Sequence, residues 1–529
     1  MVRRWNGWGE EEINLPLPAG ALELLKQLLG PGTPPLDARL DDVLATLPPG
    51  RLPHHSLVVT DPEIRLRHSR GQSLPDWIEL RSGRVGRVPD GVAFPVSSDE
   101  VRQLLGYAQK HGISVIPYGG GTSVVGHLTP VGDAPVLVLA LSRMDRLLDL
   151  DEQSHLATFQ AGVSGPRLEE QLAERGYTLG HYPQSFEYST LGGWVATRSS
   201  GQQSLGYGRI ERLFAGGRLE TPCGTLFMPP LPASAAGPDL KELVLGSEGR
   251  CGVLTEVTVR VRRRPGREYF GGCFLPDLDA GVAAVQELVR QRLPLVMLRL
   301  SDPQETATTL AMAGHSRLIR WLEKYLTWRG VGGNKCLLLF GAAGSEPEVD
   351  FARRRVAQVV RCYGGVMLGS KPGQQWYHTR FQVPYLRNSL WEGGYAVDTL
   401  ETAVPWSKAV ALAGELVQSL QQGLADIGER VHAYSHLSHV YTDGCSIYVT
   451  YLFRLAAQPE ENLRRWQQLK ELASRIIVRY GGTISHQHGV GTDHKPYLAA
   501  EKGELGLELI AGAVRLFDRH GIMNPGKLF

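Results

Sequence analysis

Three segments of the chain are rich in glycine, serine and threonine, and such segments can surround a phosphate group with backbone donors. They lie at residues 119–123, 191–201 and 246–252. Glycine accepts positive φ angles and adds no side-chain bulk, so backbone N–H groups can face a ligand closely. Each segment alone is also typical of a tight turn. Three of them within one region favour a site for a nucleotide-type cofactor.

None of these segments matches the G-x-G-x-x-G pattern of Rossmann folds or the Walker A pattern of P-loop NTPases. The nearest approach to Walker A, at residues 364–371, places serine before lysine. A P-loop NTPase is therefore disfavoured, and the predicted cofactor site is of another kind.

Arg299 lies inside an otherwise apolar segment, residues 295–300, which is typical of a buried strand. An unpaired charge is costly at such a position, and a guanidinium group suits the oxygens of a phosphate. Alternatively, Arg299 faces solvent, because Met297, Arg299 and Ser301 share one side of a strand with a period of two. The sequence leaves both interpretations open.

The glycine-rich segments lie in a region where helices and strands alternate. Ser97 and Glu100 form the pattern of a capping box for a helix that ends at Gly112. The other predicted elements are strands at residues 113–117, 136–141, 157–163 and 252–261, and a helix that begins after Ser164. This alternation predicts layered α/β structure.

A second alternating region follows a basic linker at residues 262–266. Its predicted elements are helices at residues 279–290, 346–363 and 460–480, and strands at residues 295–300, 336–340 and 445–453. We divide the chain into a helical N-terminal segment (1–87), a first domain (88–264), a second domain (265–480) and a C-terminal segment (481–529). The N-terminal segment includes a predicted amphipathic helix at residues 21–29.

The composition excludes several classes of protein. Of the 529 residues, 42% are hydrophobic and 21% charged, which is ordinary for a globular protein and not for a disordered one. The formal charge of +2 provides no global attraction for nucleic acid. No apolar run approaches the roughly 18 residues of a membrane helix, and residues 1–20 do not resemble a signal peptide. Six cysteines without a C-x-x-C pair indicate reduced thiols and a cytoplasmic location.

Four motifs, in order along the chain, resemble those of the vanillyl-alcohol-oxidase-type flavoproteins. They are Pro117-Tyr118-Gly119-Gly120-Gly121-Thr122-Ser123, Ser189-Thr190-Leu191-Gly192-Gly193, Gly246-Ser247-Glu248-Gly249 and residues 521–527. The resemblance implies an α+β or α/β fold with a two-subdomain PCMH-type FAD-binding domain, an α/β cap domain with a mostly antiparallel sheet, and helical terminal segments. It also implies non-covalent FAD, contacted by Pro117, Gly119, Gly120, Gly121, Thr122, Ser123, Ser189, Thr190, Gly192, Gly193, Thr197, Ser200, Gly246, Glu248, Gly249, Val253 and Asn524.

Further motifs resemble one branch of that superfamily, the alkyldihydroxyacetonephosphate synthases. They are Arg4-Trp5-Asn6-Gly7-Trp8-Gly9, Tyr385-Leu386-Arg387-Asn388, residues 398–406 and Cys445-Ser446-Ile447-Tyr448. The resemblance implies exchange of the acyl chain of acyl-dihydroxyacetone phosphate for a fatty alcohol, which makes an ether lipid without net redox change. The expected partners are these two lipid substrates and, in a homodimer, a second copy of the chain. Because both substrates carry long chains, we also expect contact with a membrane periphery, and residues 21–29 are the candidate segment.

The same resemblance assigns roles to individual residues. Tyr448 corresponds to the catalytic tyrosine, and Arg387 and Arg299 are expected to bind the substrate phosphate. A free phenol is a poor base at neutral pH, so we expect nearby cations or donors, with Arg387 and His488 as candidates, to favour its phenolate. His486 and His488 are further candidate catalytic residues, because they belong to a run that resembles the family's three histidines before Gly-Val-Gly. Gln487 occupies the middle position and cannot titrate, so any acid–base step there is weakened or reassigned.

The sequence leaves two alternative functions open. A 2-hydroxy-acid dehydrogenase of the D-lactate or glycolate type shares the FAD motifs, but its metal-binding form has two histidines around an acidic stretch, where this chain has His439 and Tyr448 on either side of Asp443. His436 and His439 remain a half-site without an evident acidic partner, so we expect no metal. The second alternative is a flavin-binding protein without turnover, which Gln487 keeps open.

Overall fold

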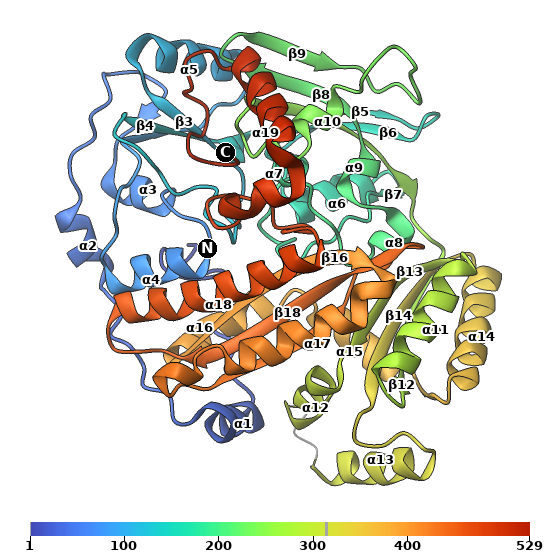
Figure 1. Ribbon diagram of the computed structural model, residues 1–529. Helices are drawn as coiled ribbons and strands as arrows, with labels where there is room; N and C mark the ends of the chain where they lie inside the picture. The colour runs from blue at the N-terminus through green and yellow to red at the C-terminus, as the bar shows by residue number, and fades with distance from the viewer. Residues whose placement is uncertain (1, 313–315) are drawn as a thin grey trace.

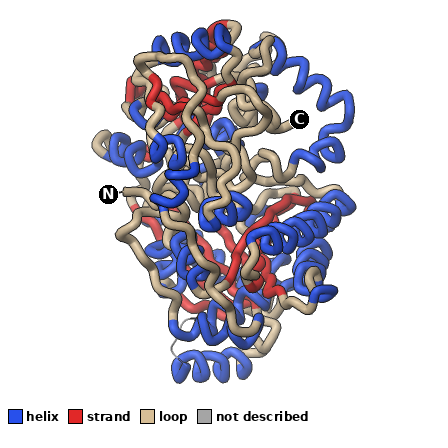
Figure 2. The backbone as a smooth tube through the Cα atoms, turned by 90° about the vertical axis from the view of Figure 1, so that its left-hand side faces the viewer, coloured by secondary structure: helices blue, strands red, loops and turns tan. Residues whose placement is uncertain are grey.

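The computed structural model describes residues 2–312 and 316–529 and shows two lobes, one above the other in Figure 1. We call residues 88–264 the glycine lobe and residues 265–480 the cap lobe. The N-terminus lies at the waist between the lobes in both Figure 1 and Figure 2. In the described part of the chain, no helix combines the length and the apolar character needed to cross a membrane.

The glycine lobe is built on two sheets, and the N-terminal segment, which was predicted to be helical, contributes strand β1 to the first of them. The first has the order β1-β2-β4-β3. It is mixed, because β1 and β2 pair antiparallel, whereas β4 pairs in parallel with both β2 and β3. Its strands are β1 (Val58–Val59), β2 (Gly91–Ala93), β3 (Ser114–Tyr118) and β4 (Val136–Ala140), and α5 (Ser98–His111) precedes β3. Of the capping box predicted for α5, the contact made by the Ser97 side chain is confirmed, whereas the one expected of the Glu100 side chain is not. The Ser97 hydroxyl accepts from the Glu100 N–H, but the Glu100 carboxylate accepts from the N–H of Val96.

The second sheet is antiparallel, with the order β5-β6-β10-β8-β9. Its strands are β5 (Leu147–Asp151), β6 (Leu156–Gln160), β8 (Phe214–Thr221), β9 (Gly224–Met228) and β10 (Val253–Arg260). Short helices connect them, namely α6 (Gly165–Ala173), α7 (Leu191–Thr197), α8 (Ser204–Tyr207), α9 (Ile210–Leu213) and α10 (Lys241–Val244). A two-stranded pair of β7 (Tyr177–Thr178) and β11 (Arg262–Arg263) leads to the cap. One apolar core joins both sheets.

The cap lobe is built on one seven-stranded antiparallel sheet of order β15-β12-β14-β13-β17-β18-β16. Its strands are β12 (Arg267–Leu275), β13 (Leu295–Ser301), β14 (Cys336–Gly344), β15 (Val366–Gly369), β16 (Tyr395–Pro405), β17 (Val431–Leu437) and β18 (Gly444–Arg454). One face packs under α11 (Leu278–Arg290), α14 (Glu346–Cys362), α17 (Trp406–Gln422) and α18 (Pro459–Tyr480). The predicted antiparallel cap is confirmed.

The other face of the cap sheet carries the side chains that matter for function. Successive side chains of a strand point to opposite faces. On β18, Ile447, Val449 and Tyr451 therefore enter the helix-covered core, whereas Tyr448 and Thr450 face a cavity. This second face meets α12 (Pro303–Met312), α13 (Ser316–Trp328), α15 (Lys371–Thr379) and α16 (Leu386–Glu392).

The two terminal segments join the lobes. The N-terminal segment carries α1 (Ala19–Leu29), α2 (Leu40–Thr46), α3 (Pro62–Arg67) and α4 (Leu74–Ser82). Its Trp8 backbone exchanges two hydrogen bonds with the Asn388 side chain of α16. The C-terminal segment runs through α19 (Leu498–Phe517) and returns to the glycine lobe, where Met523 forms a β-bridge with Val115 of β3.

Candidate active site

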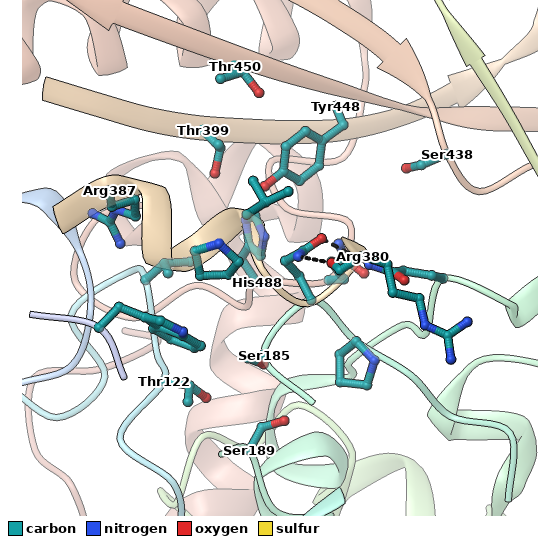
Figure 3. A pocket seen from close by; sticks show the side chains of 18 of the residues that line it. Thr122, Ser185, Ser189, Arg380, Arg387, Thr399, Ser438, Tyr448, Thr450 and His488 are labelled. Carbon is teal, nitrogen blue, oxygen red and sulfur yellow. Dashed lines mark hydrogen bonds between the residues drawn. The ribbon is translucent and has the colours of Figure 1, made fainter. Parts of the chain in front are cut away.

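A cavity of about 1390 Å³ lies between the lobes. Figure 3 shows its centre, where Tyr448 and Thr399 project from the cap above, Thr122, Ser185 and Ser189 face them from the glycine lobe below, and His488 lies between. One continuous cavity therefore brings together the glycine-rich segments and most of the titratable residues singled out in the sequence.

The loop after β3 has the shape of a cofactor cradle. A Cβ atom added to Gly120 would lie 1.8 Å from the Tyr188 carbonyl oxygen, and one added to Gly119 would lie 2.3 Å from the Thr190 hydroxyl. Gly121 has a φ of +67°, which side chains rarely adopt. Only glycine therefore lets this loop pack closely on Tyr118 and residues 188–190, and the packed loop presents a wall without side-chain bulk to the cavity, which fits the approach of a dinucleotide.

Most of the residues predicted to contact FAD line this cavity. They are Pro117, Gly119, Gly120, Gly121, Thr122, Ser123, Ser189, Thr190, Gly192, Gly193, Thr197, Ser200, Glu248, Gly249 and Asn524. Gly246 is not among the lining residues and forms a turn at φ +76°. Val253 does not line the cavity either, because its side chain is fully buried in the core of the glycine lobe.

Glu248 links the cradle to the C-terminal segment. Its buried carboxylate accepts from the backbone N–H groups of Val490, at 2.5 Å, and Gly491, at 2.8 Å, and lies 3.1 Å from Nε2 of His127. The Asn524 amide donates to the backbone oxygen of Glu248 at 2.8 Å. These contacts hold the turn that follows His488 against the cradle.

Tyr448 stands between two histidine rings. The ring of His436 on β17 stacks on it at 4.9 Å between centroids and 18° between planes, because the β17–β18 register pairs these two residues. His488 meets the phenol edge-on at 5.9 Å. Burial lowers the pKa of both histidines, so both rings are neutral at pH 7.

The expectation that neighbouring groups favour the phenolate of Tyr448 is wrong for the protein groups alone. Burial raises the pKa of Tyr448, and the carboxylates of Glu401 and Asp398 raise it further. A hydrogen bond with Thr399 and the charge of Arg387 lower it, but they do not reverse the shift. The phenol is therefore protonated at neutral pH.

Arg299 lines the cavity. The interpretation that it faces bulk solvent is therefore wrong. Its Nη2 donates to Oε1 of Glu305 on α12 at 2.7 Å, and Nδ1 of His436 lies 3.0 Å from the same oxygen. Since the carboxylate accepts, Nδ1 of His436 carries the proton and Nε2 is free to accept. His436 thus has an acidic partner, which the sequence did not reveal.

Arg387 lines the cavity on the other side of Tyr448 from Ser438 and Arg380 in Figure 3. Its Nη1 donates to the Gln72 carbonyl at 2.7 Å, and its guanidinium stacks on the Trp77 ring at 4.4 Å. The N-terminal segment therefore orients this arginine.

The histidine run divides into two roles. His488 and Gln487 line the cavity, and the Gln487 amide donates to Glu401 at 3.0 Å. His486 does not line it: its Nε2 lies 2.5 Å from Nη1 of Arg209 and 2.6 Å from the Tyr441 hydroxyl. His486 thus lies in a buried network behind the cavity wall, and its catalytic role stays a prediction.

His439 belongs to the same buried region. Its Nδ1 lies 2.8 Å from the Ser204 hydroxyl and 3.2 Å from that of Ser200, and its ring lies 5.0 Å from that of His486. Among the described residues, no group of three or more histidine, cysteine, aspartate or glutamate side chains is arranged to hold a metal ion. All six cysteines are free thiols.

Several residues that shape the site were not found from the sequence. They are Glu305, Arg209 and His127, and the motif at residues 398–406 was noted without a role for its Thr399 and Glu401. Their contacts with His436, His486, Glu248, Tyr448 and Gln487 join distant parts of the chain, and no local pattern signals such a pairing.

The fold and the cavity define a flavoprotein of the FAD-linked oxidase type. Residues 89–228 match the family model described as "FAD binding domain", and residues 264–528 match "FAD linked oxidases, C-terminal domain". The glycine cradle described above provides the backbone space that FAD requires.

Comparison with individual proteins identifies the branch of FAD-linked flavoproteins to which the chain belongs. An alkyldihydroxyacetonephosphate synthase of Dictyostelium discoideum is 32% identical over 99% of this chain and 93% of its own length. One of Trypanosoma brucei brucei is 33% identical over 88% of this chain and 78% of its own. A solved structure of an alkyldihydroxyacetonephosphate synthase superposes with a TM-score of 0.85 at 29% identity and covers 99% of this chain and 98% of that one. The chain belongs to the alkyldihydroxyacetonephosphate synthase family.

Proposed function

We propose that this protein is an FAD-dependent alkylglycerone-phosphate (alkyldihydroxyacetonephosphate) synthase. It exchanges the acyl chain of acyl-dihydroxyacetone phosphate for a fatty alcohol in ether-lipid synthesis, without net redox change. The observation that carries the proposal is the continuity of one cavity, which runs from the glycine cradle past Tyr448 and His488 to walls of aliphatic side chains. Relatives named for this activity over nearly the whole chain support it.

The apolar walls suit two long-chain reactants. One part is formed with Leu25, Leu390 and Leu452, and another with Phe274 and Met297, and these residues belong to two separate apolar clusters. Burying an alkyl chain stabilises the complex by about 0.8 kcal/mol per methylene group. The cavity therefore has space for chains that would otherwise remain in a lipid phase.

Arg299 and Arg387 supply positive charge for the substrate phosphate. Both line the cavity, and each already donates one hydrogen bond that fixes its position, to Glu305 and to the Gln72 carbonyl respectively. A guanidinium fork keeps further donors for phosphate oxygens. We assign phosphate binding to this pair.

Proton transfer is assigned to Tyr448 together with His488. When bound, FAD supplies a ring that accepts electron density from the carbon next to the substrate carbonyl. Removal of a proton from that carbon needs a base within reach, and the neutral imidazole of His488 lies beside the phenol. The protonated Tyr448 can donate to the leaving carboxylate, and Thr399 and Arg387 stabilise its phenolate once the proton has left.

The test is an incubation of the yellow protein with labelled acyl-dihydroxyacetone phosphate and hexadecanol, followed by analysis for ether product. Tyr448→Phe should lose exchange while FAD stays bound. Tyr269→Phe is the matched control, since Tyr269 lies on β12 of the same sheet and packs against the helix-covered core. Retained exchange in Tyr448→Phe would remove this residue from the mechanism.

The same preparation distinguishes the other functions. Bleaching of the flavin by D-lactate or glycolate without ether product would assign the protein to 2-hydroxy-acid oxidation. A yellow protein that shows neither bleaching nor release of fatty acid would be a flavin-binding protein without turnover.

We further propose a homodimer that works in the cytoplasm at a membrane periphery. The free cysteines support a reducing compartment. Leu505, Leu509 and Leu516 on α19 are all more than 70% exposed and offer an apolar strip on which a second copy can pack. Light scattering should give twice the mass of one chain for the wild type. For Leu509→Glu it should give the mass of a single chain.

A further inference from the structure

A second and smaller cavity lies at the surface near the junction of the two lobes. Its volume is about 220 Å³, and α8, α9 and the junction of β10 and β11 form its walls. It shares no lining residue with the active-site cavity. The side chains of Arg212, Arg260 and Arg262, which we call the arginine cluster, line it, and among the described residues no aspartate or glutamate does. Three positive charges therefore surround this space, and its walls carry no negative charge.

The lack of acidic partners distinguishes the arginine cluster from other arginines of the linker. Arg263 lies 3.6 Å from a carboxylate oxygen of Glu152, and Arg267 lies 2.7 Å from one of Glu346. Neither of these two arginines lines the small cavity. The positive charge of the linker is thus balanced beside the cavity but not at the cavity itself.

Acidic residues close to the arginine cluster are paired elsewhere. Glu211 adjoins Arg212 in the sequence, but its carboxylate lies 2.6 Å from Nε of Arg209. Asp239, on the loop before α10, lies 2.8 Å from Nζ of Lys241. Like charges around a small space repel each other, and unpaired surface charges of one sign attract a counterion. An anion in this cavity would relieve the repulsion.

Backbone contacts fix two of the guanidinium groups beside the space. Nη1 of Arg260 donates to the carbonyl oxygens of Arg212 and Phe214, at 3.2 and 3.0 Å. Nη1 of Arg262 donates to the Gly206 carbonyl at 2.8 Å. A guanidinium group has five N–H donors, so each of the two keeps others for a ligand. Because these positions are already set, less side-chain freedom is lost when a ligand binds.

The chemistry of the arginine cluster favours a phosphate group as the ligand. A planar guanidinium group donates pairs of hydrogen bonds that match phosphate oxygens, and several such groups suit a dianion. The cavity is smaller than the roughly 300–1,000 Å³ of pockets for drug-sized ligands. It therefore suits inorganic phosphate or a small phosphomonoester, and not a nucleotide.

Helix α8 lies between the arginine cluster and the active site. A Cβ atom added to Gly206 would lie 2.7 Å from Cγ1 of Val296, so the backbone of α8 rests directly on β13, the strand of Arg299. The Ser204 hydroxyl of the same helix lies 2.8 Å from Nδ1 of His439, which lines the active-site cavity. Figure 1 shows α8 beside the end of β13 at the waist of the molecule. An anion that holds α8 in place therefore acts at the junction of both lobes.

We propose that the arginine cluster binds a phosphate group, as inorganic phosphate or as a small soluble phosphomonoester, and that the bound anion fastens the linker between the lobes to α8 and α9. Arg262 belongs to the linker and Arg212 to α9, so one anion in contact with both joins these segments. The site is separate from Arg299 and Arg387, to which the proposed function assigns the substrate phosphate. Binding at the arginine cluster does not depend on that function.

Calorimetric titration of the full-length yellow protein with sodium phosphate, at an ionic strength held constant with sodium chloride, tests the binding. One class of sites should be at the arginine cluster and a second in the active-site cavity. Arg212→Gln/Arg262→Gln should weaken the first class roughly tenfold or more, and Arg387→Met should affect only the second. Both cluster residues are exposed, so flavin absorbance should stay unchanged in the double variant. Arg263→Gln is the matched control, since Arg263 is exposed beside Arg262 but paired with Glu152.

Limited digestion with trypsin tests whether the anion fastens the linker. Trypsin cuts after exposed arginines such as Arg263, and phosphate should slow this cut in the wild type. In Arg212→Gln, whose linker sequence is intact, phosphate should give no protection. Glycerol 3-phosphate is titrated in the same way, and the anion that binds more tightly identifies whether the site takes the free ion or the phosphomonoester.

Equal affinity of the wild type and the double variant for phosphate overturns the proposal. An equal loss of affinity in Arg263→Gln also overturns it, because the effect is then one of general surface charge. The same holds if sodium chloride at the same ionic strength protects the linker from trypsin as well as phosphate does. If instead the proposed function is wrong, no ether product forms while phosphate still binds at the arginine cluster, so the two failures are distinguishable.

Discussion

The substitution Glu305→Gln tests whether the ion pair of Glu305 with Arg299, and its hydrogen bond with His436, stabilise the fold and the surroundings of Tyr448. Glu305 is 6% exposed and accepts from Arg299 and from His436, which stacks on Tyr448. Burial alone would raise the pKa of this carboxyl group, but Arg299 and His436 lower it from 4.5 to about 2. At 1.36 kcal/mol per pKa unit, ionised Glu305 contributes about 3 kcal/mol to folding at neutral pH.

The pH dependence of this contribution has a definite sign. Because the pKa is lower in the folded state than in the unfolded state, the stabilisation is complete above about pH 5 and is lost as the pH falls through 2. At pH 3 the unfolded carboxyl is almost fully protonated and the folded one is still mostly ionised, so about 2 kcal/mol is already lost. The difference between wild type and Glu305→Gln should shrink accordingly.

The assay is urea unfolding followed by tryptophan fluorescence at pH 7 and pH 3, with ether-product formation as a second readout. Glu346→Gln is the control, because its pairing with Arg267 is on the surface, where such contacts contribute little. Exchange should fall in Glu305→Gln, since an amide oxygen accepts less strongly than a carboxylate from His436 and no longer balances the charge of Arg299. A difference below about 1 kcal/mol at pH 7, or one independent of pH, would refute the reasoning.

Three other substitutions test other parts of the site. Gly120→Val should give a colourless protein, because even a single Cβ would lie 1.8 Å from the Tyr188 carbonyl oxygen, and normal absorbance at the flavin band would contradict the cradle assignment. Glu248→Gln should raise the dissociation constant for FAD about tenfold in calorimetry, since an amide accepts less strongly than a carboxylate from the two N–H groups of the C-terminal turn, and an unchanged constant would count against that link. Arg299→Lys should raise KM for the phosphate substrate about tenfold with kcat nearly kept, because a point charge cannot serve both Glu305 and a phosphate; lower kcat at constant KM would place Arg299 elsewhere in the mechanism.

Helices and strands whose apolar residues recur with a regular period could be predicted from the sequence. The helix expected at residues 460–480 is α18 (Pro459–Tyr480), and the strand expected at residues 295–300 is β13 (Leu295–Ser301). Residues 303–328 carry no predicted element, although α12 and α13 lie there.

The site could be predicted where its chemistry is local and not where it depends on tertiary pairing. The glycine cradle follows from residue types alone. The partner of His436 does not, because Glu305 lies 131 residues away and reaches it only through the packing of α12 on β17. The raised pKa of Tyr448 likewise follows from its surroundings in the fold and not from its motif.

The contact between Glu248 and the turn at Val490 and Gly491, with Asn524 against the same loop, has a consequence for biosynthesis. When a ribosome has translated residue 480, both lobes have been made, but the wall that closes the cradle has not. We therefore expect cofactor capture to be completed only after translation ends, and a chain released before Asn524 should emerge colourless even if both of its lobes have folded.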